Sequence, residues 1–136
     1  MFDGNERETP PLGRRRASIL IIEDDFAIRR TLAEILGDEG YDVRCAADGR
    51  EGLAMLAERS ARPKLIILDL WMPLLGGLEF RWLQRSFAEW ADIPVLVITA
   101  WRFTPRQVPE LGLEDVLRKQ LQLDELLAKV RDMTSR

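Results

Sequence analysis

Charged and hydroxylic side chains follow four short apolar runs of this sequence. Asp69 follows one run, Thr99 follows the next, and Lys119 lies just beyond the last. The first run is followed directly by three acidic residues, Glu23, Asp24 and Asp25. If these runs are parallel strands, their carboxyl ends meet at one edge of a sheet, which is where ligands bind in folds of this class.

This set of side chains suits phosphoryl chemistry. Carboxylates that lie close together repel one another, and a hard cation such as Mg²⁺, which prefers oxygen ligands, relieves that repulsion. A carboxylate can also act as a nucleophile toward phosphorus. A hydroxyl such as that of Thr99 and a compact cation such as Lys119 then stabilise charge on the phosphoryl oxygens.

Each residue taken singly also has a structural explanation. Asp25 is well placed to cap the helix that follows it. A threonine at a strand end is usually structural, and a lysine there is usually solvated. Their common position at one sheet edge is what favours the chemical interpretation.

The elements that would position these residues alternate along the chain. Apolar or alternating stretches predict strands at 18–22, 41–46, 65–68, 95–98 and 115–117. Helical spacing of apolar residues predicts helices at 26–39, after Asp48, at 78–90 and at 123–133. Repeated strand–helix units indicate an α/β fold with a parallel sheet and right-handed crossovers. Pro105 and Pro109 predict that a fourth helix, between the last two strands, is short, distorted or absent.

Composition narrows the class of protein. The chain has 136 residues and no histidine, and the lack of histidine excludes catalysis by an imidazole group. Its formal net charge of −3 argues against a general attraction to nucleic acid. The lone Cys45 excludes an internal disulfide, and no apolar run approaches the length of a membrane span. We therefore expect a cytoplasmic protein with a flexible tail at 1–17, one domain at 18–133, and a short end at 134–136.

Several motifs together resemble the receiver domain of two-component response regulators. The resemblance covers about residues 17–132, and its elements occur in the family's order. They are ILIIEDD at 19–25, LIILDLWMP at 65–73, GLE at 77–79, VITA at 97–100 and the lysine of VLRKQ at 116–120. It implies a flavodoxin-like, doubly wound (βα)₅ fold with a five-stranded parallel sheet in the order 2-1-3-4-5.

The resemblance also implies a role for each site residue. Asp69 would be the phosphoacceptor, and Thr99 and Lys119 would contact the phosphoryl group. Asp24 would bind Mg²⁺ directly and Glu23 through water. The backbone carbonyl of Trp71, two residues beyond the acceptor, would be a further metal ligand.

The partners implied are a sensor histidine kinase or phosphotransfer protein upstream and a protein target downstream. No membrane or direct nucleic-acid contact is expected. The domain would be a phosphorylation switch rather than a metabolic enzyme, with at most autocatalysed phosphotransfer and dephosphorylation at Asp69. A weak homodimer stays open as an option.

The sequence departs from the family's pattern at several positions. Gln120 follows the lysine where the family has a cis-proline, which favours a trans bond there. Val116 replaces the aromatic switch residue, and the stretch 99–119 is slightly shorter than usual. Trp71 and Trp101 border the acceptor, where their rings would either shield an acyl phosphate or contact a partner.

Three functional hypotheses follow. The leading one is a stand-alone phosphoacceptor switch, with the N-terminal part of a longer regulator as a variant of it. The second is a pseudo-receiver that docks without phosphorylation, which the departures favour and the complete acceptor set opposes. The third is an aspartyl phosphatase or phosphotransferase, which would need a cap or substrate pocket for which the chain has little room.

Overall fold

The computed structural model describes residues 17–58, 62–70, 72, 75–100, 106, 109–113, 115–119 and 121–135. The predicted tail therefore lies outside the described residues except for Ala17. Four residues singled out from the sequence also lie outside them, namely Trp71, Trp101, Pro105 and Gln120.

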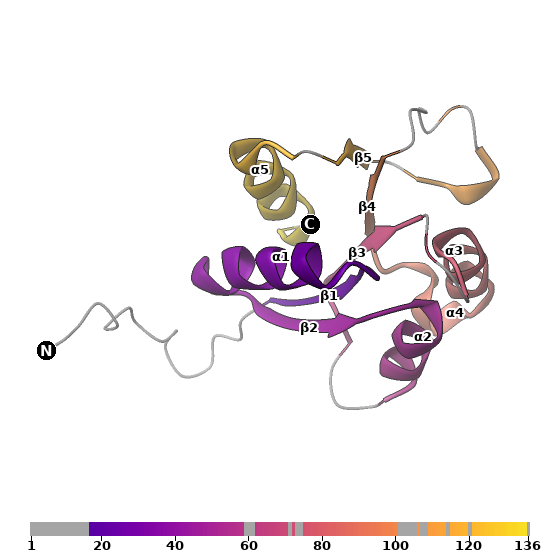
Figure 1. Ribbon diagram of the computed structural model, residues 1–136. Coiled ribbons are helices and arrows are strands. Elements are labelled where there is room, and N and C mark those ends of the chain that lie inside the picture. Colours follow the sequence, from indigo (N-terminus) through magenta and orange to yellow (C-terminus); the bar gives the residue numbers. More distant parts are fainter. Residues whose placement is uncertain are drawn as a thin grey trace, which may run out of the picture.

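The five predicted strands form one parallel sheet in the order β2-β1-β3-β4-β5, which confirms the predicted topology (Figure 1). Their bounds are β1 (Ser18–Ile22), β2 (Asp42–Ala46), β3 (Leu65–Asp69), β4 (Val95–Thr99) and β5 (Asp115–Arg118). The continuous apolar runs of β1, β3 and β4 occupy the centre because both of their faces are covered. The less apolar β2 and β5 are the edges.

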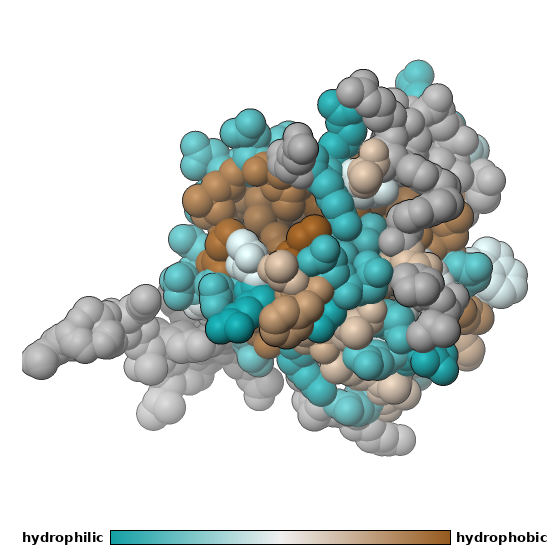
Figure 2. Space-filling view, viewed as in Figure 1, coloured by the Kyte–Doolittle hydropathy of each residue, from teal (hydrophilic) through white to brown (hydrophobic). Residues whose placement is uncertain are grey.

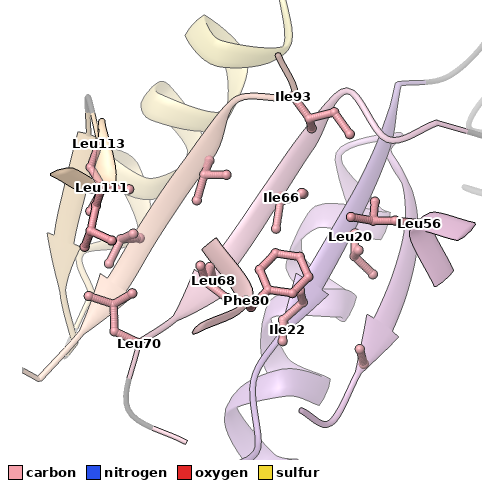
Figure 3. Packing of buried hydrophobic residues seen from close by; sticks show 13 residues of the cluster. Leu20, Ile22, Leu56, Ile66, Leu68, Leu70, Phe80, Ile93, Leu111 and Leu113 are labelled. Atoms are coloured by element: carbon pink, nitrogen blue, oxygen red, sulfur yellow. The ribbon is translucent and has the colours of Figure 1, made fainter. Parts of the chain in front are cut away.

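Helices cover both faces of the sheet (Figure 1). One face carries α1 (Phe26–Asp38) and α5 (Leu123–Thr134), and the other carries α2 (Gly49–Ala57), α3 (Gly77–Ser86) and α4 (Ala88–Ala91). Alternate strand residues therefore belong to two separate cores. Ile19 and Ile21 pack on the α1–α5 side, whereas Leu20 and Ile22 pack on the other side, where Phe80 of α3 fills the centre (Figure 3).

Local signals set the helix starts as predicted. The Asp25 carboxylate accepts a hydrogen bond from the Ile28 amide at 3.0 Å, and so caps α1. Asp48 caps α2 in the same way, accepting from the amides of Arg50 and Glu51. Both caps satisfy donors that would otherwise lack intrahelical partners.

The single helix predicted at 78–90 is wrong, because the structure breaks it at Phe87. This residue has an extended backbone (φ −109°, ψ 123°), which ends α3 and precedes the short α4. Buried Gln84 stabilises the break, since its amide donates to the carbonyls of Trp90 and Ile93 at 2.6 and 3.2 Å. The rings of Phe87 and Trp90 also pack together, with centroids 4.8 Å apart.

The crossover from β4 to β5, where the sequence predicts a fourth helix that is short, distorted or absent, is described only at residues 100, 106 and 109–113. These residues contain a 3₁₀ turn, Pro109–Leu111, and the helix labelled α4 lies earlier, before β4. Arg81 of α3 is buried and donates to the carbonyls of Leu111 and Gly112 at 2.9 and 3.0 Å. A third bond, 2.6 Å long, joins Arg81 to the Gln84 side chain. The crossover is thus anchored to α3 by polar side chains.

Gln84 supports this anchor through Arg81 and also holds the break at Phe87, so replacing it with alanine tests both. The variant loses three hydrogen bonds in a buried setting, so we expect the free energy of unfolding to fall by about 2–3 kcal/mol. Urea denaturation followed by circular dichroism measures the change. Gln122→Ala is the control, because Gln122 is exposed and makes no side-chain cap to α5. Equal stability of the two variants would contradict the anchor.

Candidate functional site

Three carboxylates meet at the carboxyl edge of the sheet. Glu23 and Asp24 follow β1, and Asp69 is the last residue of β3. One oxygen from each lies within 4.8 Å of the others. Glu23 and Asp69 are almost completely buried (0% and 1% exposed), whereas Asp24 is exposed. Two of the three carboxylates are therefore buried, and the third faces solvent.

Among the residues that the structure describes, Lys119 is the cation that pairs with this cluster. Its ammonium lies 3.2 Å from Asp69 Oδ2 and 3.2 Å from Glu23 Oε1, and its hydrogen bond to Glu23 goes to Oε2 at 3.3 Å. The Lys119 amide donates to the Thr99 carbonyl at 2.9 Å, which fixes the start of the lysine loop. One side chain thus joins the ends of β1, β3 and β5.

The backbone of the acidic pair is held by groups around it. The Glu23 amide donates to the Ala46 carbonyl at 3.1 Å, and Glu23 Oε2 accepts from the Asp25 amide at 3.0 Å. Arg29 of α1 donates to the carbonyl oxygens of Glu23 and Asp24 at 2.8 and 3.4 Å. The sequence interpretation missed Arg29. In the sequence, Arg29 is marked only as a cation near the start of a helix that follows the acidic pair. Cations are common at such positions, so this pattern does not identify a site residue.

A close approach of α3 positions Asp69. A Cβ atom added at Gly77 would overlap the Asp69 carbonyl oxygen and lie 2.5 Å from Leu70 Cα. Because both contacts are to backbone, a larger residue at this position would displace the end of β3. The Gly77 amide also donates to the Leu70 carbonyl, so the first turn of α3 lies against the residue that follows Asp69.

Burial and charge set the electrostatics of the cluster. Burial raises the pKa of Glu23 from 4.5 to about 7, and nearby Asp69 adds to this, while the Asp25 amide and Lys119 act in the opposite direction. Burial alone would lower the pKa of Lys119, but attraction from the Asp69 and Glu23 carboxylates outweighs it and raises that pKa. The lysine therefore remains charged, and the cluster has more carboxylates than cations.

The cluster fits a hard divalent cation. Glu23 Oε1 is buried and accepts no hydrogen bond, although the Lys119 ammonium lies 3.2 Å from it. Three carboxylates share a small space with one ammonium. A cation with oxygen ligands supplies the charge that this arrangement lacks.

The structure brings together four of the predicted site residues: Glu23, Asp24, Asp69 and Lys119. Thr99 is buried at the end of β4, one residue past Ile98, which pairs with Asp69 in the sheet. Trp71, the remaining predicted metal ligand, lies outside the described residues. The roles assigned to all six stay predictions.

Comparison with known proteins decides the family. A family model described as the response regulator receiver domain matches residues 19–131. The chain belongs to this family. Receiver domains are signalling modules of two-component systems that bind Mg²⁺ at an acidic pocket, and response regulators interact with histidine kinases or phosphotransfer proteins and with downstream targets.

Two relatives in sequence are named as response regulators. The chain is 42% identical over 120 residues to "Response regulator MprA" of Mycolicibacterium vanbaalenii, covering 87% of this chain and 50% of that protein. The protein of the same name from Mycobacterium avium is also 42% identical over 120 residues, covering 87% of this chain and 51% of its own length. The receiver thus spans about half the length of these relatives.

Solved receiver structures have the same fold. Chemotaxis protein CheY4 of Vibrio cholerae superposes with a TM-score of 0.79 at 30% identity, covering 88% of this chain and 99% of that one. A putative response regulator from Chloroflexus aurantiacus gives a TM-score of 0.80 at 27% identity, covering 90% of this chain and all of the other. Among the described residues of this receiver, no helix has the length and apolar character needed to cross a membrane.

The raised pKa of Glu23 predicts how stability changes with pH. Because this pKa is 4.5 without the fold's influence and about 7 within it, folding takes up a proton in that window. The free energy of unfolding should therefore fall as pH rises from 4.5 to about 7, by an amount on the order of 1–3 kcal/mol. Glu23→Gln should remove this loss.

Urea denaturation in EDTA at both ends of the window measures the effect. Glu34→Gln is the control, because the Glu34 side chain is 65% exposed on α1. Parallel pH dependence in the wild type and Glu23→Gln would show that the buried carboxyl is not the cause.

Proposed function

We propose that this receiver accepts a phosphoryl group on Asp69 and thereby switches a protein-interaction surface. The observation that carries the proposal is the ion pair of 3.2 Å between Lys119 and the buried Asp69, inside a cluster of three carboxylates. Glu23, Asp24, Asp69 and the backbone carbonyl of Trp71 would hold Mg²⁺. When bound, the ion supplies positive charge opposite the phosphoryl oxygens.

Asp69 acts as the nucleophile. One carboxylate oxygen forms a bond to phosphorus as the bond from phosphorus to the donor breaks, and the donor leaves with that electron pair. For a phosphohistidine donor the leaving group is the imidazole nitrogen. Burial of Asp69 keeps bulk water from the carboxylate, which strengthens its interactions with nearby charges.

Lys119 changes partner during this step. Before transfer its ammonium is shared by Asp69 and Glu23. After transfer, the Asp69 carboxyl is part of a mixed anhydride with phosphate and the charge resides on the phosphoryl oxygens, so the ammonium is attracted to these instead. Thr99, buried at the neighbouring strand end, would donate its hydroxyl to another phosphoryl oxygen. These two movements change the ends of β4 and β5 and give the switch.

An apolar groove beside the acceptor suits a phosphodonor protein. The groove has a volume of about 350 Å³ and lies between α1 and α5, where Figure 2 shows a hydrophobic patch. Its walls include Ala27 and Ile28, just after the acidic loop, and Leu121 and Leu123, just after Lys119. A sensor kinase or phosphotransfer protein that reaches Asp69 would therefore contact this groove, and a downstream target would bind the surface altered by transfer.

Direct phosphorylation tests the proposal. With Mg²⁺ and acetyl phosphate or phosphoramidate, the wild type should gain the mass of one phosphoryl group, as measured by intact mass spectrometry under non-hydrolysing conditions. Asp69→Asn should gain none, because an amide is a poor nucleophile. Asp92→Asn is the control, since it removes one carboxylate at the other end of the sheet. No gain by the wild type at saturating donor would favour the pseudo-receiver.

Addition of Mg²⁺ without a donor tests the metal assignment. Binding to the folded state alone should raise the melting temperature, and at ten times the dissociation constant the gain in stability is about 1.4 kcal/mol. The shift should be lost in Asp24→Asn and kept in Asp38→Asn, which alters an exposed carboxylate at the end of α1. An equal shift in both variants would contradict a site at this cluster.

A further inference from the structure

Asp24 is the least supported carboxylate of the acidic cluster. Glu23 and Asp69 are buried, and both pair with the Lys119 ammonium. Asp24 is exposed, and its side chain has no hydrogen bond or ion pair with any residue that the structure describes. An aspartate side chain is short, so the position of its carboxylate depends mainly on the backbone that carries it. The backbone at Asp24 therefore decides whether this carboxylate faces the other two.

Arg29 of α1 holds that backbone on both sides of the Asp24 Cα. Its Nη1 atom donates to the Glu23 carbonyl at 2.8 Å and, in a longer and weaker bond, to the Asp24 carbonyl at 3.4 Å. These two carbonyls belong to the peptide groups that flank the Asp24 Cα. Because each peptide group is planar, fixing the direction of both leaves little freedom in the φ and ψ of Asp24. Arg29 thus sets the direction of the Asp24 Cα–Cβ bond.

The Arg29 side chain is itself held in place. It is half-buried, and its guanidinium lies over the Phe26 ring, 5.5 Å from the ring centroid. The Arg29 amide donates to the Asp25 carbonyl at 2.9 Å, which fixes the residue in the first turns of α1. The guanidinium forms no ion pair with a carboxylate of the described residues. Its polar contacts there are the carbonyls of the acidic pair, which suits a role in holding backbone.

We propose that Arg29 is a positioning residue for the metal site. By holding the two carbonyls, it aims the Asp24 carboxylate at the space shared with Glu23 and Asp69, so less freedom is lost when Mg²⁺ binds. Arg29 acts through Asp24 and does not contact the ion. The inference rests on the magnesium site of the proposed function, and it adds the residue that keeps the exposed ligand of that site in place.

The charge of Arg29 has the opposite effect on metal binding. A guanidinium near the cluster repels a divalent cation, so loss of that charge by itself would strengthen the binding of Mg²⁺. Loss of the two hydrogen bonds weakens binding, because the backbone at Asp24 gains freedom. The sign of the change in affinity therefore separates the positioning role from an effect of charge.

Calorimetric titration of the full chain with Mg²⁺, without a phosphodonor, tests the proposal. Arg29→Met keeps an unbranched stem but removes the donors, and we expect its dissociation constant for Mg²⁺ to rise about five- to tenfold. Arg29→Lys keeps the charge and can hold one carbonyl, so its constant should lie between those of the wild type and Arg29→Met. Arg30→Met is the matched control, because the Arg30 side chain is 66% exposed on the same helix. It should bind Mg²⁺ like the wild type.

The outcomes separate this proposal from the function on which it rests. Absence of Mg²⁺ binding by the wild type would overturn the metal site, and the positioning role with it. Binding by the wild type with equal or tighter binding by Arg29→Met would overturn the positioning role alone, and so would equal weakening in Arg29→Met and Arg30→Met. If circular dichroism shows that Arg29→Met does not fold, Arg29→Lys carries the test, and an affinity equal to that of the wild type would overturn the role.

Nuclear magnetic resonance relaxation of the metal-free protein tests how Arg29 acts. The order parameter of the Asp24 amide should fall in Arg29→Met and keep its wild-type value in Arg30→Met, since only the first variant loses the bonds that restrain this backbone. The amide of Ile21, inside β1, is the internal reference and should not change. An unchanged order parameter at Asp24 in Arg29→Met would overturn the proposal, even with weaker metal binding.

Discussion

The ion pairing of Lys119 with two buried carboxylates is the interaction on which the acceptor edge depends. Glu23 and Asp69 are both inaccessible to water, and a buried carboxylate without a cation is strongly disfavoured. The lysine meets this need only because β5 ends beside β4 and its amide bonds to the Thr99 carbonyl. Even so, burial, with a smaller contribution from Asp69, raises the pKa of Glu23 to about 7 despite the nearby ammonium. Three carboxylates beside one ammonium leave excess negative charge, which suits the site to a metal ion. The metal ion and the lysine would together supply the cations that a phosphoryl group needs.

The order and parallel direction of the strands bring these groups together. The three central strands are apolar on both faces, and polar residues come at their carboxyl ends: Asp69 ends β3, Thr99 ends β4, and Glu23 directly follows β1. Parallel alignment then brings those ends to one edge. Close packing finishes the positioning, since Gly77 lets α3 begin against the Asp69 carbonyl and Arg29 holds the carbonyls of the acidic pair.

Sequence reasoning recovered what depends on local pattern and chain order. Strand positions, the sheet order and the caps at Asp25 and Asp48 follow from hydrophobic runs, turn residues and the family resemblance. It missed what depends on contacts between distant segments. The break at Phe87 arises because Gln84 bonds to carbonyls beyond it, and a helical apolar stripe gives no sign of that competition. The role of Arg81 in holding the β4–β5 crossover likewise depends on tertiary placement.

A crystal structure with Mg²⁺ and beryllofluoride, a mimic of the phosphoryl group, tests the acceptor site most directly. We expect beryllofluoride bonded to an Asp69 carboxylate oxygen, the Lys119 ammonium moved from Asp69 onto a fluorine, and the Thr99 hydroxyl donating to another. Density for Mg²⁺ should lie among Glu23, Asp24 and Asp69. An unmodified Asp69 still paired with Lys119, in crystals saturated with both reagents, would contradict this expectation.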